Sequence, residues 1–230
     1  MMNANGFLGH LVGALSRHTP AFAPDRLHEP GLDNSLITAL ARSGPAFSAP
    51  DTPDDLGRDL RRRNLTDANL TDANLARANL TRATLTRARL INADLTHADL
   101  TQANLTDADL ARADLTDADL APANLTRANF TRANLTRADL TGAWLTGADL
   151  TRAWLTDANL TDADLTGADL TGANLGVTVR VERLGGVRWN AATNWPAHQA
   201  AEIRAVSDEL PDGTFRVWNG QERLPTNVLS

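Results

Sequence analysis

The sequence predicts an all-β solenoid, because one five-residue pattern runs from Asn64 to Leu175 without insertion or deletion. Leucine occupies every fifth position from Leu65 to Leu175, except that Phe130 replaces it once. Alanine stands two residues before that position in every repeat from Ala68 to Ala173. A fixed short repeat of this kind is typical of solenoids, in which each repeat packs only on its neighbours.

A period of five fits neither regular element. On an α-helix each repeat advances by about 500°, so successive leucines are rotated by about 140° and form no stripe. On a flat strand an odd period places successive leucines on opposite faces. The chain therefore turns once per repeat, always in the same direction. The leucines then lie inside with alanine at the tight corners, while the Asp/Asn, Thr and variable positions lie outside.

The run A-(D/N)-L-T-x resembles the pentapeptide-repeat family over Asn64–Leu175, about half of the chain, with a weaker lead-in at Asp59-Leu60. The resemblance implies a right-handed quadrilateral β-helix with four repeats per coil and the central Leu or Phe inside. About six coils are expected, with a length of roughly 28 Å at the spacing of paired strands. The expected core ladder includes Leu95, Leu115, Phe130, Leu135 and Leu155.

The repeat divides the chain into an N-terminal arm (1–57), the β-helix (58–176) and a C-terminal cap (177–230). Six prolines restrict the Pro-rich arm to short helices, expected near Phe7–Arg17 and Ser35–Arg42. In the cap, alternating valines predict a strand over 177–182. A helix is expected to open at Asn194-Trp195-Pro196, and a second strand is expected over Thr214–Trp218.

The last coil of a solenoid exposes core leucine and unpaired backbone, so it needs a cover. Trp189, Trp195 and Trp218 are expected to pack over that coil, with Ile203 on the apolar side of the cap helix. The same C-terminal region is a candidate surface for a homodimer.

Composition narrows the class of protein. The chain has no cysteine, which excludes disulfide and thiolate chemistry and fits a cytoplasmic location. The formal net charge is −6, and residues 64–175 contain 15 Asp against 9 Arg. Such a surface disfavours direct nucleic acid binding and suits basic protein partners. No run approaches the roughly 20 apolar residues of a membrane span, and the apolar stretch Gly6–Leu15 lacks the basic start of a signal peptide.

No pattern indicates catalysis. The five histidines share no metal-ligand spacing, and neither a phosphate-binding loop nor a nucleophile motif is present. We therefore expect a non-enzymatic binding protein with no catalytic residue, no cofactor and no metal.

If four repeats make one coil, residues twenty apart stack and outward charges fall into columns. The candidate partner-binding aspartates are Asp99, Asp119 and Asp139 in one column, with Asp94, Asp114 and Asp117 on the next face. A basic column is expected from Arg112, Arg132 and Arg152. Aspartate is also a common turn residue that accepts backbone hydrogen bonds. Two interpretations stay open: a local turn role, or carboxylates that imitate the phosphates of a duplex.

Trp144 and Trp154 replace Asp/Asn at the outward position and are expected on opposite faces of one coil. Tryptophan is enriched at binding hot spots, so either residue is a candidate anchor for a partner. The alternative is that the arm or the cap covers them.

The family resemblance implies one function, a DNA mimic that binds DNA gyrase or another type II topoisomerase and gives quinolone resistance. The acidic solenoid supports this function, whereas the arginine column places positive charge on a surface that should be negative in a DNA mimic. A 28 Å rod also matches only about eight base pairs, so a homodimer would be required for a longer mimic. The alternative function is a generic protein-interaction scaffold without nucleic-acid mimicry, with the Trp144/Trp154 coil as its docking surface.

Overall fold

The computed structural model describes residues 59–176 and 179–218. The arm, with the two short helices expected near Phe7–Arg17 and Ser35–Arg42, lies outside the described residues, as does the C-terminal segment 219–230.

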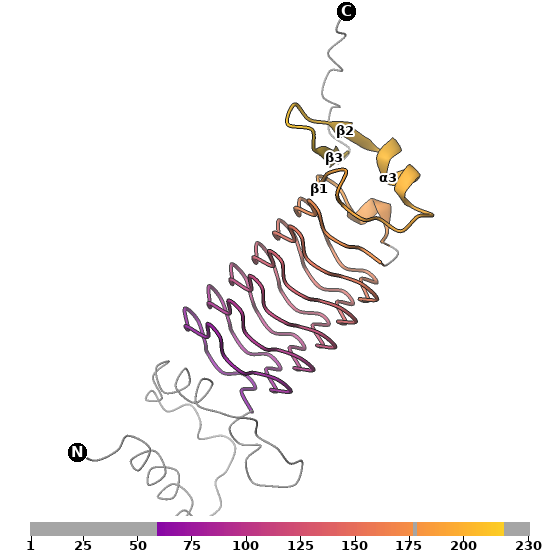
Figure 1. Ribbon diagram of the computed structural model, residues 1–230. Coiled ribbons are helices and arrows are strands. Elements are labelled where there is room, and N and C mark those ends of the chain that lie inside the picture. The colour runs from indigo at the N-terminus through magenta and orange to yellow at the C-terminus, as the bar shows by residue number, and fades with distance from the viewer. Residues whose placement is uncertain (1–58, 177–178, 219–230) are drawn as a thin grey trace, which may run out of the picture. The chain divides into compact units, whose positions relative to one another are not determined.

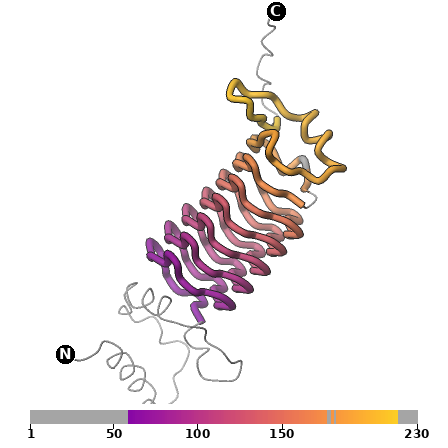
Figure 2. Tube along the Cα trace, in the orientation of Figure 1, coloured from indigo at the N-terminus to yellow at the C-terminus, as the bar shows by residue number. Residues whose placement is uncertain are grey.

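The repeats form a stack of coils of twenty residues each (Figure 2). Parallel bridges join residues twenty apart without interruption, from Asp59↔Asn79 to Trp154↔Asn174. Four repeats therefore make one turn, as the resemblance implied. Figure 1 shows the coils lying in register above one another.

A typical repeat contains one turn and backbone hydrogen bonds to the next coil. In the repeat at Leu65, the Ala68 N–H donates to the Leu65 carbonyl (3.0 Å), which closes the turn. The Leu65 N–H donates to Thr84 of the next coil (2.7 Å). The Asn64 side chain accepts the N–H of Thr66 (3.1 Å). The sequence pattern follows: a small residue at the corner, a side-chain acceptor before the leucine, and a turn residue at φ 59° in Asp67.

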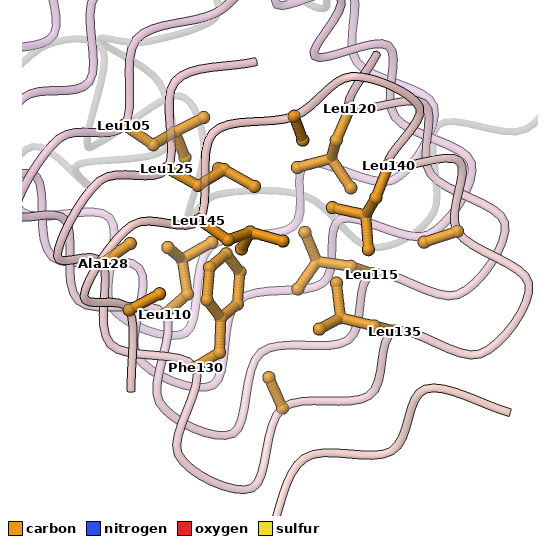
Figure 3. Close-up of a cluster of buried hydrophobic side chains, with 14 of the residues drawn as sticks. Leu105, Leu110, Leu115, Leu120, Leu125, Ala128, Phe130, Leu135, Leu140 and Leu145 are labelled. Carbon is orange, nitrogen blue, oxygen red and sulfur yellow. The ribbon is translucent and has the colours of Figure 1, made fainter. Parts of the chain in front are cut away.

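The core is built from the central residues of the repeats, stacked in four columns, together with the corner alanines. Leu95, Leu115, Phe130, Leu135 and Leu155 are all 0% exposed. Figure 3 shows the Phe130 ring pointing inward among the leucines of the adjacent coils. Burial of each such side chain contributes about 1.5–3 kcal/mol, so the ladder is the main source of stability.

The hydrogen-bonded ladder continues past residue 176 into the cap. The Leu170 N–H donates to the Arg188 carbonyl (2.7 Å) and the Leu175 N–H to the Asn194 carbonyl (2.8 Å). Trp189 and Trp195, each one residue further on, are buried where central leucines would stand. The repeat pattern does not reveal this continuation, because tryptophan replaces leucine there and the two tryptophans are six residues apart.

The rest of the cap consists of short elements. They are the 3₁₀-helix η3 (Val181–Arg183), β1 (Arg188–Trp189), α3 (Ala200–Ala205), β2 (Ser207–Glu209) and β3 (Phe215–Val217). The strands form an antiparallel sheet in the order β1-β3-β2 (Figure 1). β3 falls within the strand expected over Thr214–Trp218.

Two expectations for the cap differ from the structure. Of the strand expected over 177–182, residues 177 and 178 lie outside the described residues, residues 181–183 form η3, and Val179 pairs with a side chain rather than with a strand. Its N–H donates to Gln199 Oε1 (2.9 Å) and its carbonyl accepts from Gln199 Nε2 (2.7 Å). The helix α3 begins at Ala200 rather than near Asn194, because Asn194 is held in the ladder by its bridge to Asn174.

The helices in the described part of the chain are short. None of them has the length and apolar character that a membrane crossing requires.

Candidate protein-interaction surfaces

One side of the β-helix carries a stack of carboxylates. We call the outward residues of the repeats centred on Leu100, Leu120 and Leu140 the acidic side. Its charged members are Asp99, Asp119 and Asp139, and bridges stack them directly over one another. The outward positions of these three repeats contain no basic residue.

The arginines at the two ends of the acidic side form contacts that do not include the three stacked carboxylates. One coil before Asp99, Arg82 donates from Nε to Gln102 Oε1 (2.7 Å). One coil after Asp139, Arg180 of the cap pairs with Asp162 (3.2 Å). Within residues 59–176 and 179–218, no ion pair reaches the three stacked carboxylates, so their negative charge is not neutralised locally.

These aspartates also have a local structural role. One oxygen of each stacked carboxylate accepts the N–H two residues further on: 2.9 Å in Asp99, 3.0 Å in Asp119 and 2.9 Å in Asp139. Burial acts to raise the pKa of Asp99, but hydrogen bonds from Thr101 and Thr81 outweigh it and lower the pKa. In Asp99 the turn role therefore favours the charged form, and the two interpretations of that residue are compatible.

The other candidate aspartates lie on the next side and differ from one another. Asp94 and Asp114 are joined by a bridge. Asp114 also accepts a hydrogen bond from Asn134 Nδ2 (3.3 Å). Asp117 forms an ion pair with Arg137 at 2.6 Å, so its charge is neutralised and it does not extend an acidic surface.

Three arginines at the turn position pair with an aspartate one coil earlier, and each pair is solvent-exposed. The pairs are Arg87–Asp67 (2.8 Å), Arg127–Asp107 (2.7 Å) and Arg137–Asp117 (2.6 Å). In every pair the side-chain hydrogen bond from arginine lowers the pKa of the aspartate. These columns alternate in sign and contribute little net charge to the surface.

The pairing predicts a small pH-dependent stabilisation. Because the pKa of Asp107 is lowered from 3.8 in the folded protein, the stabilisation is present above that value and is lost as the pH falls through the folded-state pKa. We expect Arg127→Gln to lower the Tm slightly at pH 7, since exposed pairs contribute little, and to have no effect in strong acid. Thermal unfolding monitored across this range tests it, with Arg132→Gln as the unpaired control. A difference that persists in acid would show that Arg127 acts through packing instead.

A second set of turn arginines has no such partner. Arg112, Arg132 and Arg152, which we call the basic edge, stack one coil apart: the Arg112 N–H donates to the Thr131 carbonyl (3.0 Å) and the Arg132 N–H to the Thr151 carbonyl (2.9 Å). All three are exposed. Within residues 59–176 and 179–218, none of them forms an ion pair, in contrast to Arg87, Arg127 and Arg137.

The two outward tryptophans are exposed. Trp144 is 60% exposed and Trp154 is 62% exposed. They are ten residues apart, which is half a coil, so they lie on opposite sides. Trp144 follows Gly142, the last turn of the acidic side, and Trp154 follows Arg152 of the basic edge. The described part of the cap leaves both side chains accessible.

The cap tryptophans are arranged differently from one another. Trp189 and Trp195 pack edge to face with ring centroids 6.0 Å apart, and Trp189 also contacts Phe215 at 4.5 Å. Ile203 is fully buried, whereas Trp218 is 45% exposed, so only two of the three tryptophans close the end of the core. Sequence reasoning missed the packing role of Phe215, since its strand spans only three residues.

The described residues offer no site for a metal: no group of three or more His, Cys, Asp or Glu side chains is placed to hold an ion. What they offer chemically is a set of long, fixed faces, which defines the class as a short-repeat β-solenoid scaffold.

Comparison with known proteins identifies the family within this class. The family model for pentapeptide repeats matches eight copies over residues 64–102, 103–142, 113–152 and 143–176. The chain belongs to the pentapeptide-repeat family, whose members fold as right-handed quadrilateral β-helices. The family prediction is therefore confirmed.

Several solved structures are similar. HetL from the cyanobacterium Nostoc sp. strain PCC 7120, involved in heterocyst differentiation regulation, is 32% identical over 53% of this chain and 72% of its own, with a TM-score of 0.26. A pentapeptide repeat protein of the Arabidopsis thaliana thylakoid lumen is 29% identical over 59% and 85%, with a TM-score of 0.27. A trypsin-treated variant of QnrB1, a plasmid-mediated fluoroquinolone resistance protein, is 18% identical over 65% and 92%, with a TM-score of 0.29. Among curated proteins, no sequence matches this chain.

Proposed function

We propose that this repeat scaffold is a non-enzymatic, cytoplasmic binding protein whose acidic side, together with Trp144, binds a basic surface of a partner protein. The observation that carries the proposal is the stack of Asp99, Asp119 and Asp139, with no arginine among the outward residues of their repeats. Aspartates at the turn position, such as Asp107 and Asp117, are instead paired with arginine.

The geometry suits recognition by charge with an aromatic anchor. The carboxylates are held at fixed spacing by backbone hydrogen bonds, so little ordering is required on binding. Complementary charge raises association rates and selects partners more than it adds affinity. Trp144, on the side that follows, supplies the large apolar contact that such an interface needs.

Replacement of the acidic column by asparagine tests this proposal. Asparagine accepts the same turn hydrogen bond, as Asn104 Oδ1 does from the Thr106 N–H (3.0 Å), so Asp99→Asn/Asp119→Asn/Asp139→Asn should fold normally. With a fluorescein-labelled deca-lysine peptide at low salt, we expect the triple variant to bind at least tenfold more weakly than the wild type, measured by fluorescence anisotropy.

The matched control is Asp109→Asn/Asp149→Asn/Asp169→Asn. These aspartates occupy the same repeat position on another side and accept the same backbone hydrogen bond (3.2, 2.9 and 2.9 Å), so their replacement removes the same charge. Equal weakening by both triple variants would show that only net charge matters, and the acidic side would then not be a distinct binding surface.

A second candidate function is a DNA mimic that binds DNA gyrase and protects it from drugs. The unneutralised acidic column favours it. Its charge density is lower than that of DNA, however: one stacked carboxylate per coil of about 4.8 Å, against one phosphate charge per about 1.7 Å of duplex. The basic edge adds opposite charge elsewhere. A homodimer through the C-terminal region would lengthen the acidic surface.

The gyrase candidate is tested by supercoiling of relaxed plasmid with the full chain titrated in, with and without a quinolone. Inhibition or drug protection at micromolar protein, lost in the acidic-column triple variant and kept in the control triple, supports mimicry. No effect at any concentration excludes gyrase as the partner, while the peptide titration still tests the acidic side itself.

A further inference from the structure

We infer that the protein has a second docking surface of opposite charge, formed by the basic edge and Trp154, which binds an extended acidic segment of a partner protein. This surface is separate from the acidic side and goes beyond the function proposed above. With both surfaces occupied, the solenoid would connect an acidic partner to a basic one.

The first observation is the absence of internal partners for these arginines. Carboxylates lie on the columns flanking the basic edge, in Asp109, Asp114 and Asp149, yet within the described residues no ion pair joins any of them to it. Arg132 stands between Asn129 and Asn134. The donors of the basic edge are therefore available to an external anion.

The second observation is the backbone conformation. Arg112, Arg132 and Arg152 have φ of 59°, 60° and 58°, a left-handed conformation that costs a residue with a Cβ about 1–2 kcal/mol. Glycine adopts it freely, as in Gly172, which continues the same column at φ 68°. Every turn residue from Arg62 to Gly172 except Pro122 has this conformation, so the repeat itself imposes it. What distinguishes the basic edge is that Arg127 and Arg137 gain an ion pair at the turn position, whereas within the described residues the basic edge gains none.

The third observation is the position of Trp154. It follows Arg152 by two residues, with only the buried Ala153 between them, and it stacks over Asn134, which follows Arg132 in the same way. An exposed tryptophan thus borders two unpaired arginines. Tryptophan and arginine are the residues most enriched at binding hot spots, and arginine clusters recognise acidic motifs.

The chemistry favours an acidic peptide over two other anionic occupants. A nucleic acid would have to approach a protein of net charge −6, which opposes binding over a long range. A second copy of this chain would bring another −6 with its acidic side. A short acidic segment concentrates its carboxylates where the arginines stand, can lie along their column, and can place an apolar side chain on Trp154.

The test uses a fluorescein-labelled peptide of eight glutamates with one central leucine and the full-length protein. We expect Arg112→Gln/Arg132→Gln/Arg152→Gln and Trp154→Ala each to weaken its binding at least tenfold. The matched controls are Arg87→Gln/Arg127→Gln/Arg137→Gln, which removes the same charge from the same turn position, and Trp144→Ala, which has similar exposure on the opposite side. Both should change the Kd less than twofold.

Each other result overturns the inference. Equal loss in both arginine triple variants would mean general charge attraction only. Tighter binding of an oligo-dT strand than of the peptide would make the edge a nucleic-acid surface. A dimer in sedimentation that the acidic-column triple variant dissociates would make it a contact between copies. The deca-lysine titration is independent of this test. A negative result with the glutamate peptide does not affect the proposal for the acidic side, and a negative result with deca-lysine does not affect the proposal for the basic edge.

Discussion

Replacing Phe130 by alanine is expected to lower the free energy of unfolding by about 3–5 kcal/mol. Phe130 is fully buried and is the largest central side chain of the pentapeptide repeats (Figure 3). Its removal leaves a cavity between coils whose backbones are fixed by hydrogen bonds above and below, from Phe130 N–H to Asp149 (2.7 Å) and from Leu110 N–H to Asn129 (2.7 Å). The surrounding backbone therefore cannot move in to fill the cavity, so the loss in free energy of unfolding should lie at the upper end of the range for core truncations.

Urea unfolding followed by circular dichroism measures this loss, and Phe130→Leu is the control. Leucine restores the repeat consensus and a similar volume, so a cost below about 1.5 kcal/mol is expected. If the alanine variant were as stable as the leucine variant, the interior at this level could not be packed as described.

Replacing Trp189 by alanine is expected to lower the free energy of unfolding by about 3–5 kcal/mol, and the loss should be localised at the C-terminal end of the core. Trp189 fills a leucine position, packs against Trp195 and Phe215, and donates from Nε1 to Ser207 Oγ (3.0 Å). Its loss separates the cap sheet from the last coil, because no other buried side chain makes all of these described contacts.

Hydrogen exchange measures the effect at the amides of Leu170 and Leu175, which donate to Arg188 and Asn194. Their protection should fall while that of Leu115 is kept, since a solenoid is stabilised by neighbouring repeats. Trp218→Ala, at an exposed position, should change little. Unchanged protection at Leu170 and Leu175 in the Trp189 variant would show that the cap does not stabilise the coil.

The core ladder could be predicted because its signal is redundant: each leucine is identified by its spacing from all the others. The number of sides could not be derived from the period, since any closed coil of pentads satisfies it, and came from the family resemblance. The cap was only partly predictable. Trp189 and Trp195 continue the ladder, but they are six residues apart and so do not match the five-residue pattern. The Gln199 side chain takes the place of a strand partner of Val179, and no local sequence pattern predicts that contact.

The charged surfaces follow from the same twenty-residue spacing, applied column by column. Arg127 is paired because Asp107 lies beneath it, and Arg132 is not because Arg112 lies beneath it. That distinction was present in the sequence and appears once every column is written out. The exposure of Trp144 and Trp154 could not be predicted from the sequence, because it depends on what the flanking segments cover.

Both docking surfaces depend on one structural claim, that outward residues twenty apart are neighbours. The absence of cysteine from the chain allows a direct measurement of it. In Asp119→Cys/Asp139→Cys the two residues are bridged, and the roughly 4.8 Å between paired strands falls within the roughly 4.4–6.8 Å that a disulfide requires between Cα atoms. Mild oxidation should link them, as detected by mass and electrophoretic mobility. Asp119→Cys/Asn134→Cys, fifteen apart and on adjacent sides, should stay reduced. Equal or preferential linking of the second pair would contradict the four-repeat coil, and with it the acidic side and the basic edge.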